Sequence, residues 1–340
     1  EEAPRYHGRD VAIVRAQRAG ALAVLGSATP SMETAFNAMS GKFERILLER
    51  RVLDRPLASV TVVDMREEYA VGGPDVILSR ALAEGLAARL DRGEQSVVLL
   101  NRRGFATAVF CRQCGGTMDC PNCSVSLVVH GQGPTRRARC HYCNYVIRVP
   151  NACLQCKAPY LEQMGYGTER VEAEIRKACP GARVARLDRD SVRRRGALTS
   201  RLAEFRDGAI DVLVGTQMIA KGHDFPRVTL VGVVSADIGL GTADFRASER
   251  TFQLLTQVAG RAGRGEQPGE AIVQTIHPDH YSIQLACRQD YGAFFERELH
   301  FRKAMRYPPV VALINVVVRA RTFVGAMDDA GVLAQQLRVR

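Results

Sequence analysis

Four Cys-x-x-Cys pairs in the middle of the chain constrain its folding more than any other feature of the sequence. Eight of the ten cysteines lie between residues 111 and 156, with the spacing C-x2-C-x5-C-x2-C-x16-C-x2-C-x9-C-x2-C. Two thiolates separated by two residues can bind one ion from a tight turn, and two such turns complete a tetrahedral structural zinc site. Eight thiolates therefore predict two zinc ions. The segment has too few apolar residues for a core, so metal would have to stabilise it.

Two other interpretations of these cysteines are weaker. A disulfide framework needs an oxidising compartment, and the charged N-terminus EEAPRYHGRD has no apolar signal-peptide core. A redox Cys-x-x-Cys motif is not expected four times in one segment. The spacing leaves the grouping open: either the outer pairs share one ion and the inner pairs the other, or consecutive pairs do. The outer pairs are Cys111/Cys114 and Cys153/Cys156, and the inner pairs are Cys120/Cys123 and Cys140/Cys143.

Outside the cysteine segment, apolar strands alternate with amphipathic helices. Apolar runs predict strands at 59–65, 95–104, 182–191, 210–217, 228–237 and 270–276, and helical periodicity predicts helices at 78–93 and 167–181. Such alternation is typical of a parallel sheet covered by helices on both faces. The stretch ALAVLGSATPSMETA (21–35) predicts another buried strand, a turn, and a helix capped near Ser31. We therefore expect the cysteine segment to be an insertion into an α/β domain, and a smaller unit to begin near residue 311.

The chain carries an excess of cationic side chains. The chain has 47 lysine and arginine residues and 36 aspartate and glutamate residues, so its net charge is 47 − 36 = +11. Most of the cationic residues are arginines. The planar guanidinium donates two parallel hydrogen bonds to phosphate, so this balance favours a polyanionic partner such as nucleic acid. A solvated charged surface would give the same composition. No stretch approaches 18 uninterrupted apolar residues, so no membrane span is expected.

The segment TQVAGRAGRG (256–265) predicts a site that faces phosphate. If the segment is helical, Arg261 and Arg264 lie three residues apart on one face, and the small residues around them allow another surface to approach closely. Guanidinium groups presented in this way would stabilise the charge of a triphosphate during phosphoryl transfer. The alternative for this segment alone is a helix that forms surface salt bridges.

Two loops that follow apolar runs are further candidates. The segment VLVGTQMIAKGHDFP (212–226) leaves a strand at Thr216 and continues through Gly222 and Asp224, and LGSATP (25–30) is similar. Ligands bind at the carboxyl ends of strands in α/β sheets, so Thr216 and nearby backbone N–H groups are candidates to hold nucleic-acid phosphates. The alternative for both loops is an ordinary strand-to-helix turn.

In chain order, GSATP, GTQ-x-x-x-KG-x-DFP and Q-x-x-GRAGR resemble motifs III, V and VI of superfamily 2 helicases. The cysteine pairs, with NRRGF (101–105) before them and GTE (167–169) after them, narrow the resemblance to the PriA family of bacterial primosomal proteins, as do DFRASER (244–250) and YHGRD (6–10). The resemblance covers the chain to about residue 320. It implies an α/β fold: a RecA-like P-loop-type helicase lobe, an inserted Cys-rich two-zinc module and the start of a small α+β C-terminal domain.

The resemblance also implies a division of the chain. Residues 1–50 would be the tail of helicase lobe 1, 51–94 a connecting segment, 95–110 and 158–277 lobe 2, 111–157 the zinc insertion, and 278–340 the start of the C-terminal domain. The implied activity is an ATP-dependent 3′-5′ DNA helicase that recognises stalled or abandoned forks and initiates primosome assembly. Its cofactors would be two Zn²⁺ and ATP with Mg²⁺. Its partners would be forked and single-stranded DNA, primosome and helicase-loading proteins, and single-stranded-DNA-binding protein. A monomer in the bacterial cytoplasm, associated with the nucleoid at forks, is implied.

The resemblance assigns roles to particular residues. The residues that match motif VI and would contact ATP phosphates are Gln257, Arg261 and Arg264; those at the motif V turn are Gly222 and Asp224. The residues expected to bind DNA or couple hydrolysis to its movement are Ser27, Ala28, Thr29, Thr216, Arg102, Arg103, Tyr6, His7 and Arg9. For the cysteines, the resemblance implies that the outer pairs share one zinc and the inner pairs the other.

Two motifs of an ATP-driven motor do not occur in the 340 residues. The sequence contains no G-x-x-x-x-G-K-[ST] and no D-E-x-H. In the family both motifs precede YHGRD, so we expect this chain to be a fragment of a longer protein and to lack ATPase activity alone. Two alternatives remain. One is a non-motor scaffold that binds DNA and proteins for primosome loading; the other is an RNA helicase, in which the cysteine insertion is not expected.

Overall fold

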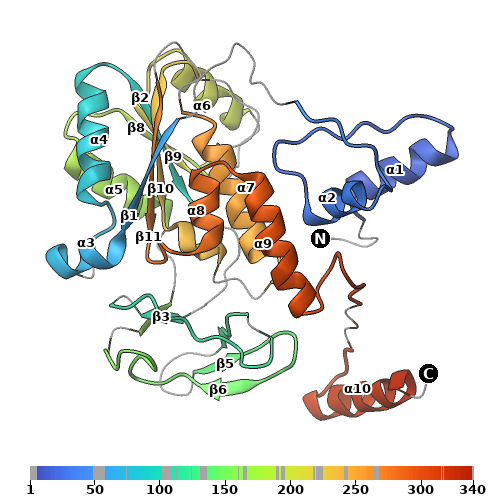
Figure 1. The fold of residues 1–340 in the computed structure, drawn as a ribbon. Coiled ribbons are helices and arrows are strands. Elements are labelled where there is room, and N and C mark those ends of the chain that lie inside the picture. Colours follow the sequence, from blue (N-terminus) through green and yellow to red (C-terminus); the bar gives the residue numbers. More distant parts are fainter. Residues whose placement is uncertain are drawn as a thin grey trace. The chain divides into compact units, whose positions relative to one another are not determined.

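The chain divides into two compact units, Glu1–Leu299 and His300–Arg340. The first unit contains a large parallel sheet and a cysteine-rich module (Figure 1). The computed structural model describes residues 6–48, 58–73, 75–101, 109–111, 113–123, 125–130, 136–159, 161–163, 167–188, 191–192, 196–216, 219, 225–240, 244–262, 268–314, 316 and 318–338.

Six parallel strands form the large sheet. Their order is β1 (Ser59–Asp64), β11 (Glu270–Thr275), β10 (Val228–Val234), β2 (Gln95–Leu100), β9 (Val212–Gly215) and β8 (Val184–Leu187). Every residue of β2, β9 and β10 is buried, as the near-continuous apolar runs predict for a sheet covered on both faces. The six predicted strands are therefore confirmed.

Helices cover both faces of this sheet (Figure 1). On one face, α4 (Arg80–Asp91) and α5 (Thr168–Ala178) pack against alternate residues of β2, Val98 and Leu100. On the other face, Val97 and Leu99 contribute to a second apolar cluster. The helices of that cluster are α6 (Ala197–Arg206), α7 (Ala247–Ala259), α8 (Tyr281–Cys287) and α9 (Tyr291–Ala304). The period-two alternation of a strand thus fills two cores at once, and the predicted three-layer α/β architecture is confirmed.

The segment 51–94, expected to lead into the second lobe, contributes directly to its sheet. It provides the edge strand β1, the helix α3 (Met65–Gly72) and the covering helix α4. A short 3₁₀ helix, η3 (Ala236–Gly239), follows β10. Asp237 in η3 is buried and accepts hydrogen bonds from the backbone of Ile276 and His277, which fixes η3 against the end of β11.

The N-terminal part of the chain contains α1 (Gly8–Arg18) and α2 (Met32–Met39). Ser31 caps α2 by accepting a hydrogen bond from the Thr34 N–H, as predicted. The strand expected at 21–26 is wrong: this stretch has no regular secondary structure and pairs with no described strand, and Leu22 is 88 % exposed. An apolar run becomes a buried strand only where neighbouring strands accept its backbone hydrogen bonds, and the described part of the chain supplies none here.

The cysteine-rich module lies between β2 and α5 in the sequence, so it is an insertion into the α/β unit. Its two small antiparallel sheets pair β3 (Val109–Cys111) with β7 (Leu161–Gln163), and β4 (Val128–His130) with β5 (Arg137–Arg139) and β6 (Val146–Arg148). Its apolar side chains form two small clusters, each of which contains cysteines. The module therefore has little apolar core of its own.

The second unit contains the last residues of α9, from His300 onward, and the whole of α10 (Phe323–Arg338). Residues 310–314, where a strand-like sequence begins, have no regular secondary structure. Within the described residues, no helix is long and apolar enough to cross a membrane.

Candidate metal centres and nucleotide-facing residues

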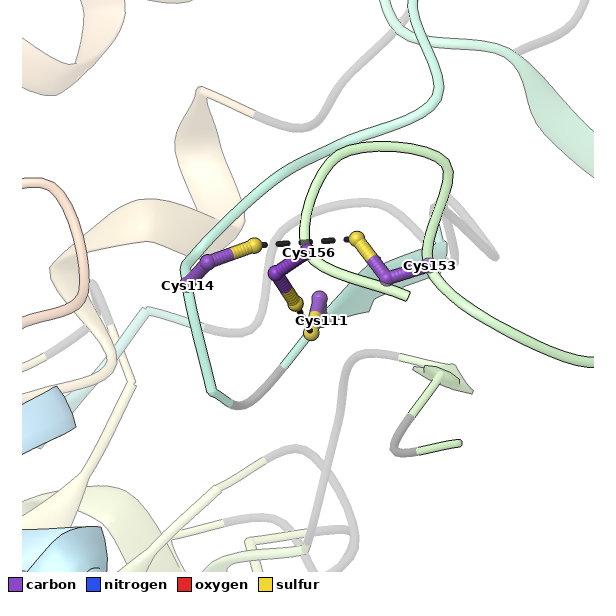
Figure 2. A group of neighbouring side chains, drawn as sticks. All are labelled: Cys111, Cys114, Cys153 and Cys156. Atoms are coloured by element: carbon purple, nitrogen blue, oxygen red, sulfur yellow. Dashed lines mark hydrogen bonds between the residues drawn. The ribbon is translucent and has the colours of Figure 1, made fainter. Parts of the chain in front are cut away.

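The eight cysteines of the module form two groups of four thiols. The outer pairs, Cys111/Cys114 and Cys153/Cys156, form one group, and the inner pairs, Cys120/Cys123 and Cys140/Cys143, form the other. Within each group all four Sγ atoms lie within 4.8 Å of one another. Figure 2 shows the side chains of the outer group pointing toward a common centre. The structure thus brings the pairs together in the nested arrangement that the resemblance implies.

The sulfur positions fit a tetrahedral zinc ion. Zinc–sulfur bonds of about 2.3 Å in a tetrahedron place the sulfurs roughly 3.8 Å apart. The Sγ–Sγ distance is 3.5 Å between Cys111 and Cys156, 3.6 Å between Cys114 and Cys153, and 3.4 Å between Cys120 and Cys143. In disulfides the sulfurs would be about 2 Å apart, so these groups have the dimensions of metal sites.

The four turns share one backbone pattern. The N–H of the first cysteine donates to the carbonyl five residues later, in the pairs Cys111–Gly116, Cys120–Val125, Cys140–Tyr145 and Cys153–Ala158. In three turns the residue after the second cysteine donates back to the first cysteine's carbonyl with a positive φ: 72° at Gly115, 61° at Asn144 and 64° at Lys157. This repeated left-handed turn aims both thiols of a pair to one side, as a shared ion requires.

Burial and backbone N–H groups act in opposite directions on the thiols. Burial raises the pKa of Cys114 to about 12, and burial also raises the pKa of Cys123 above its ordinary value. The backbone N–H of Tyr145 lowers the pKa of the exposed Cys143 to about 6. Thiols bind a metal as thiolates. A divalent cation between four thiols stabilises their negative charge and so lowers their pKa values, which burial alone raises.

His130 and His141 are not members of either group. Their Nε2 atoms lie 3.0 Å apart, and their rings stack at 5.2 Å. Each group has four thiols without them.

Among the described residues, contacts between the module and the α/β unit are seen at Gly115 and at Tyr142. Gly115 approaches the end of β11: a Cβ built at this position would lie 2.9 Å from the Ile276 carbonyl oxygen. At the other point the Phe245 N–H donates to the Tyr142 hydroxyl at 3.3 Å. Gly115 belongs to a turn of the outer group and Tyr142 to a turn of the inner group, so each metal group has its own contact with the sheet unit.

A side chain at Gly115 is expected to destabilise this contact. Gly115→Ala would place a Cβ in the left-handed region and against the Ile276 carbonyl, at a cost of about 1–3 kcal/mol for the backbone alone. Gly181→Ala is the matched control, because Gly181 has φ +91° but nothing within 4 Å of the built Cβ. Chemical denaturation should show a larger loss in the free energy of unfolding for Gly115→Ala than for Gly181→Ala. Equal losses would mean that the close approach contributes nothing.

The residues that match motif VI lie at the C-terminal end of α7. This helix ends at Ala259, with Gly260 as its C-cap, so the exposed Gln257 is in the last turn and Arg261 lies just beyond it. The expectation that Arg261 and Arg264 share a helix face differs from the structure, because α7 ends at Ala259 and Arg261 lies beyond the C-cap residue Gly260. Arg264 lies outside the described residues.

The structure brings Arg261 beside the segment that matches motif V. Arg261 lines an apolar cavity together with Ile219 and Phe225, which flank the expected turn, and with residues of β2 and β10. Thr216 directly follows β9, at the carboxyl edge of the sheet, and its carbonyl accepts from the Ile219 N–H. Gly222 and Asp224 lie outside the described residues.

The segment that matches motif III lies beside α7. Thr29 is buried, and its N–H donates to the Ser27 hydroxyl at 3.1 Å; Ser27 and Ala28 are exposed. Gln253 in α7 donates to the Thr29 carbonyl at 3.3 Å. Motif III and the helix that leads to motif VI are therefore in direct contact.

The other residues expected to bind DNA or couple hydrolysis to its movement have different surroundings. Tyr6 and His7 are exposed at the start of α1. Arg9 is half-buried and donates to the hydroxyls of Ser31 and Thr34 at the start of α2. Arg102 and Arg103 lie outside the described residues.

The N-cap residue of α7 and two residues within this helix contact residues 29–33, in and just after the motif III match, although the sequence analysis assigns them no role. They are Arg246, Glu249 and Gln253. The first two belong to DFRASER (244–250), a segment that contributes to the family resemblance. The sequence does carry a signal for this contact surface. Polar residues recur at 246, 249, 253 and 257, and this spacing of three and four residues places them on one face of a helix.

Two family models match the chain. Residues 120–148 match the zinc ribbon of the PriA DNA helicase Cys-rich region, and residues 165–266 match the helicase conserved C-terminal domain. With the parallel sheet, the helices on both faces and the two four-cysteine groups, these matches define a RecA-like helicase lobe with an inserted zinc-ribbon module. The ribbon match and the thiol geometry together support zinc binding.

Curated relatives identify the family of this chain. The chain is 46% identical over 338 residues to the replication restart protein PriA of Bacillus subtilis (strain 168), covering 99% of this chain and 42% of the relative. It is 45% identical over 318 residues to that of Synechocystis sp. (strain ATCC 27184 / PCC 6803 / Kazusa), covering 92% of this chain and 38% of the relative. RecG bound to a three-way DNA junction is similar with a TM-score of 0.45 and 14% identity, covering 90% of this chain and 30% of that chain. The chain belongs to the PriA family and spans about two fifths of these relatives' length.

Proposed function

We propose that the protein containing this chain is an ATP-dependent 3′-5′ DNA helicase of replication restart. In this proposal it recognises stalled or abandoned forks and initiates primosome assembly with helicase-loading proteins and single-stranded-DNA-binding protein. It would act as a monomer at replication forks in the bacterial cytoplasm. The observation that supports this most is the combination of a zinc-ribbon insertion with motif VI at the end of α7 in one lobe.

Within this proposal the chain divides as its sequence suggests. Residues 1–50 belong to lobe 1, 95–110 and 158–277 to lobe 2, 111–157 to the zinc insertion and 278–340 to the C-terminal domain. The segment 51–94 completes lobe 2 through β1 and α4.

The site residues act on phosphate and on DNA. Arg261, Arg264 and Gln257 would hold the ATP phosphates, with Gly222 and Asp224 at the same cleft. Bound ATP with Mg²⁺ supplies the phosphoryl transfer, and guanidinium groups stabilise the charge that develops on the phosphate oxygens. The motif III residues Ser27, Ala28 and Thr29 would couple hydrolysis to DNA movement. The residues proposed to touch DNA are Thr216, Arg102, Arg103, Tyr6, His7 and Arg9.

The test is ATP hydrolysis by the full-length protein, with forked DNA and single-stranded RNA compared side by side. We expect the fork to stimulate hydrolysis and RNA not to. Hydrolysis stimulated equally by RNA would favour an RNA helicase. A zinc-replete protein that binds forks but hydrolyses no ATP would favour the non-motor loading scaffold.

The isolated 340-residue chain is expected to show no ATP turnover above background, even with forked DNA. Its sequence has no phosphate-binding loop and no D-E-x-H motif, so ATP would lack its cradle and the magnesium ligand. Phosphate release should be measured beside DNA binding, which confirms that the chain is folded. Turnover that is abolished by Arg261→Ala would contradict this prediction, because a contaminating ATPase would not respond to that substitution.

A further inference from the structure

Helix α7 and its N-cap residue, Arg246, contact the motif III region, defined here as residues 27–34, through three side chains. The Glu249 carboxylate accepts a hydrogen bond from the Met32 N–H at 3.0 Å, across 217 positions of sequence. Gln253 donates to the Thr29 carbonyl at 3.3 Å, and Arg246 pairs with Glu33 at 2.8 Å. Contacts with this region therefore extend from the N-cap of α7 into its second turn.

The hydrogen bond between Glu249 and Met32 is a buried, specific contact and not an incidental contact at the surface. Glu249 is 4 % exposed, and a carboxylate removed from water is costly unless it accepts hydrogen bonds. Met32 is the first residue of α2, where the helix dipole favours negative charge. Gln253 also donates to the same carboxylate oxygen, at 3.5 Å. The buried carboxylate therefore joins the start of α2 to the first turn of α7.

The same face of α7 leads to the motif VI residues. Arg246, Glu249 and Gln253 are spaced by three and four residues, and Gln257 follows after another four. Residues at this spacing lie on one face of a helix. Arg261 comes four residues later, just beyond the helix end. Because a hydrogen-bonded helix of 13 residues moves as a rod, a shift of the motif III region would displace the end that carries Arg261.

The motif III region is also held from other sides. Arg9 of the YHGRD segment donates to Ser31 and Thr34 at 2.5 and 2.8 Å. The Tyr291 hydroxyl in α9 donates to the Pro30 carbonyl at 2.9 Å. The region is thus in contact both with Arg9, which is proposed to touch DNA, and with α7. These contacts would allow it to transmit a movement from the DNA to α7.

We propose that Glu249, Arg246 and Gln253 are positioning residues that couple movement of the motif III region to the placement of Arg261. The inference rests on the proposed motor function and extends it to residues outside motifs III and VI. Arg246 and Glu249 touch no nucleotide in this scheme; they determine whether a change at residues 27–34 reaches the end of α7.

The experiment uses the full-length protein and measures base pairs unwound per ATP hydrolysed, the fork-stimulated hydrolysis rate and the melting temperature. Glu249→Ala is expected to lower the coupling ratio at least about fivefold, the lower end of usual coupling between sites. Glu249→Gln should keep most of the ratio, because its amide oxygen can still accept from Met32. Arg250→Gln is the matched control, since Arg250 is on α7 but pairs with Asp244.

The ion pair between Arg246 and Glu33 allows a second, independent test of the coupling. Arg246→Gln and Glu33→Gln should each lower the coupling ratio, and the double variant should be no worse than either single one, because both remove the same contact. Additive losses in the double variant would overturn the role of this pair. A normal ratio in Glu249→Ala would overturn the role of the buried carboxylate.

A merely structural role predicts a different pattern. In that case the hydrolysis rate, unwinding and melting temperature of Glu249→Ala would fall together, Glu249→Gln would not rescue the ratio, and the inference would be overturned. A wild-type protein without fork-stimulated hydrolysis would overturn the proposed function and, with it, the coupling. A wild-type motor whose variants keep a normal ratio would overturn the coupling alone.

Discussion

Replacing Cys111 and Cys153 together with serine is expected to remove one zinc ion per chain, whereas replacing Cys111 and Cys120 together removes both. In the structure Cys111 and Cys153 belong to one group of thiols and Cys120 to the other. Grouping of consecutive pairs would give the opposite result, because Cys111 and Cys120 would then share an ion. Structural zinc sites have about 10–16 kcal/mol of apparent binding energy at neutral pH, which depends on all four thiolates. We therefore expect a site that loses even one of its thiolates to lose its ion.

The expected effect on folding is confined to the module. Its apolar clusters are separate from the two clusters of the sheet, and the described core of the sheet contains none of the eight clustered cysteines. Loss of both ions should therefore open residues 111–163 to proteolysis while the helices around the sheet retain their circular dichroism signal. Zinc content is measured by mass spectrometry of the intact protein or by release to a chelating dye.

Cys179→Ser is the control for this series. Cys179 is also buried, but it packs in the sheet core with Val171 and Ile175 and belongs to neither metal group. It should keep the zinc content of the wild type. Cooperative loss of all helical signal on zinc removal would contradict the independence of the module from the sheet.

The second large effect is expected at Arg261. In the full-length protein, Arg261→Ala should lower fork-stimulated ATP hydrolysis by about a thousandfold, the lower end of the range for an arginine that stabilises phosphoryl transfer. DNA affinity should change little, because Arg261 lies at the end of α7 beside the motif V segment, where the nucleotide is expected. Arg261→Lys should not restore the rate, since an ammonium group lacks the planar, bidentate fork.

Steady-state hydrolysis and fork binding by fluorescence anisotropy separate the two quantities. Arg250→Gln is again a suitable control, because it removes an exposed guanidinium of α7 that pairs with Asp244 at 2.8 Å. A parallel fall in fork affinity and hydrolysis for Arg261→Ala would assign this residue to DNA rather than to ATP. An unchanged hydrolysis rate would remove Arg261 from the nucleotide site.

The sequence alone determined the elements whose signals are local. The strands of the large sheet followed from apolar runs, because a strand buried on both faces needs no polar alternation. The cap of α2 followed from Ser31, and the presence of metal-binding turns followed from the Cys-x-x-Cys spacing. Each of these depends on residues that are neighbours in the chain.

Tertiary structure decided what depends on distant partners. The spacing permits either grouping of the thiols; the antiparallel pairing of β3 with β7 brings Cys111 opposite Leu161 and so toward the Cys153/Cys156 turn. The apolar stretch at 21–26 reads as a strand, yet it is exposed because no described strand pairs with it. The Glu249–Met32 bond spans 217 positions, so no local pattern specifies it. Local sequence fixes backbone preference and ligand chemistry, whereas only the folded chain brings groups from distant positions within bonding distance.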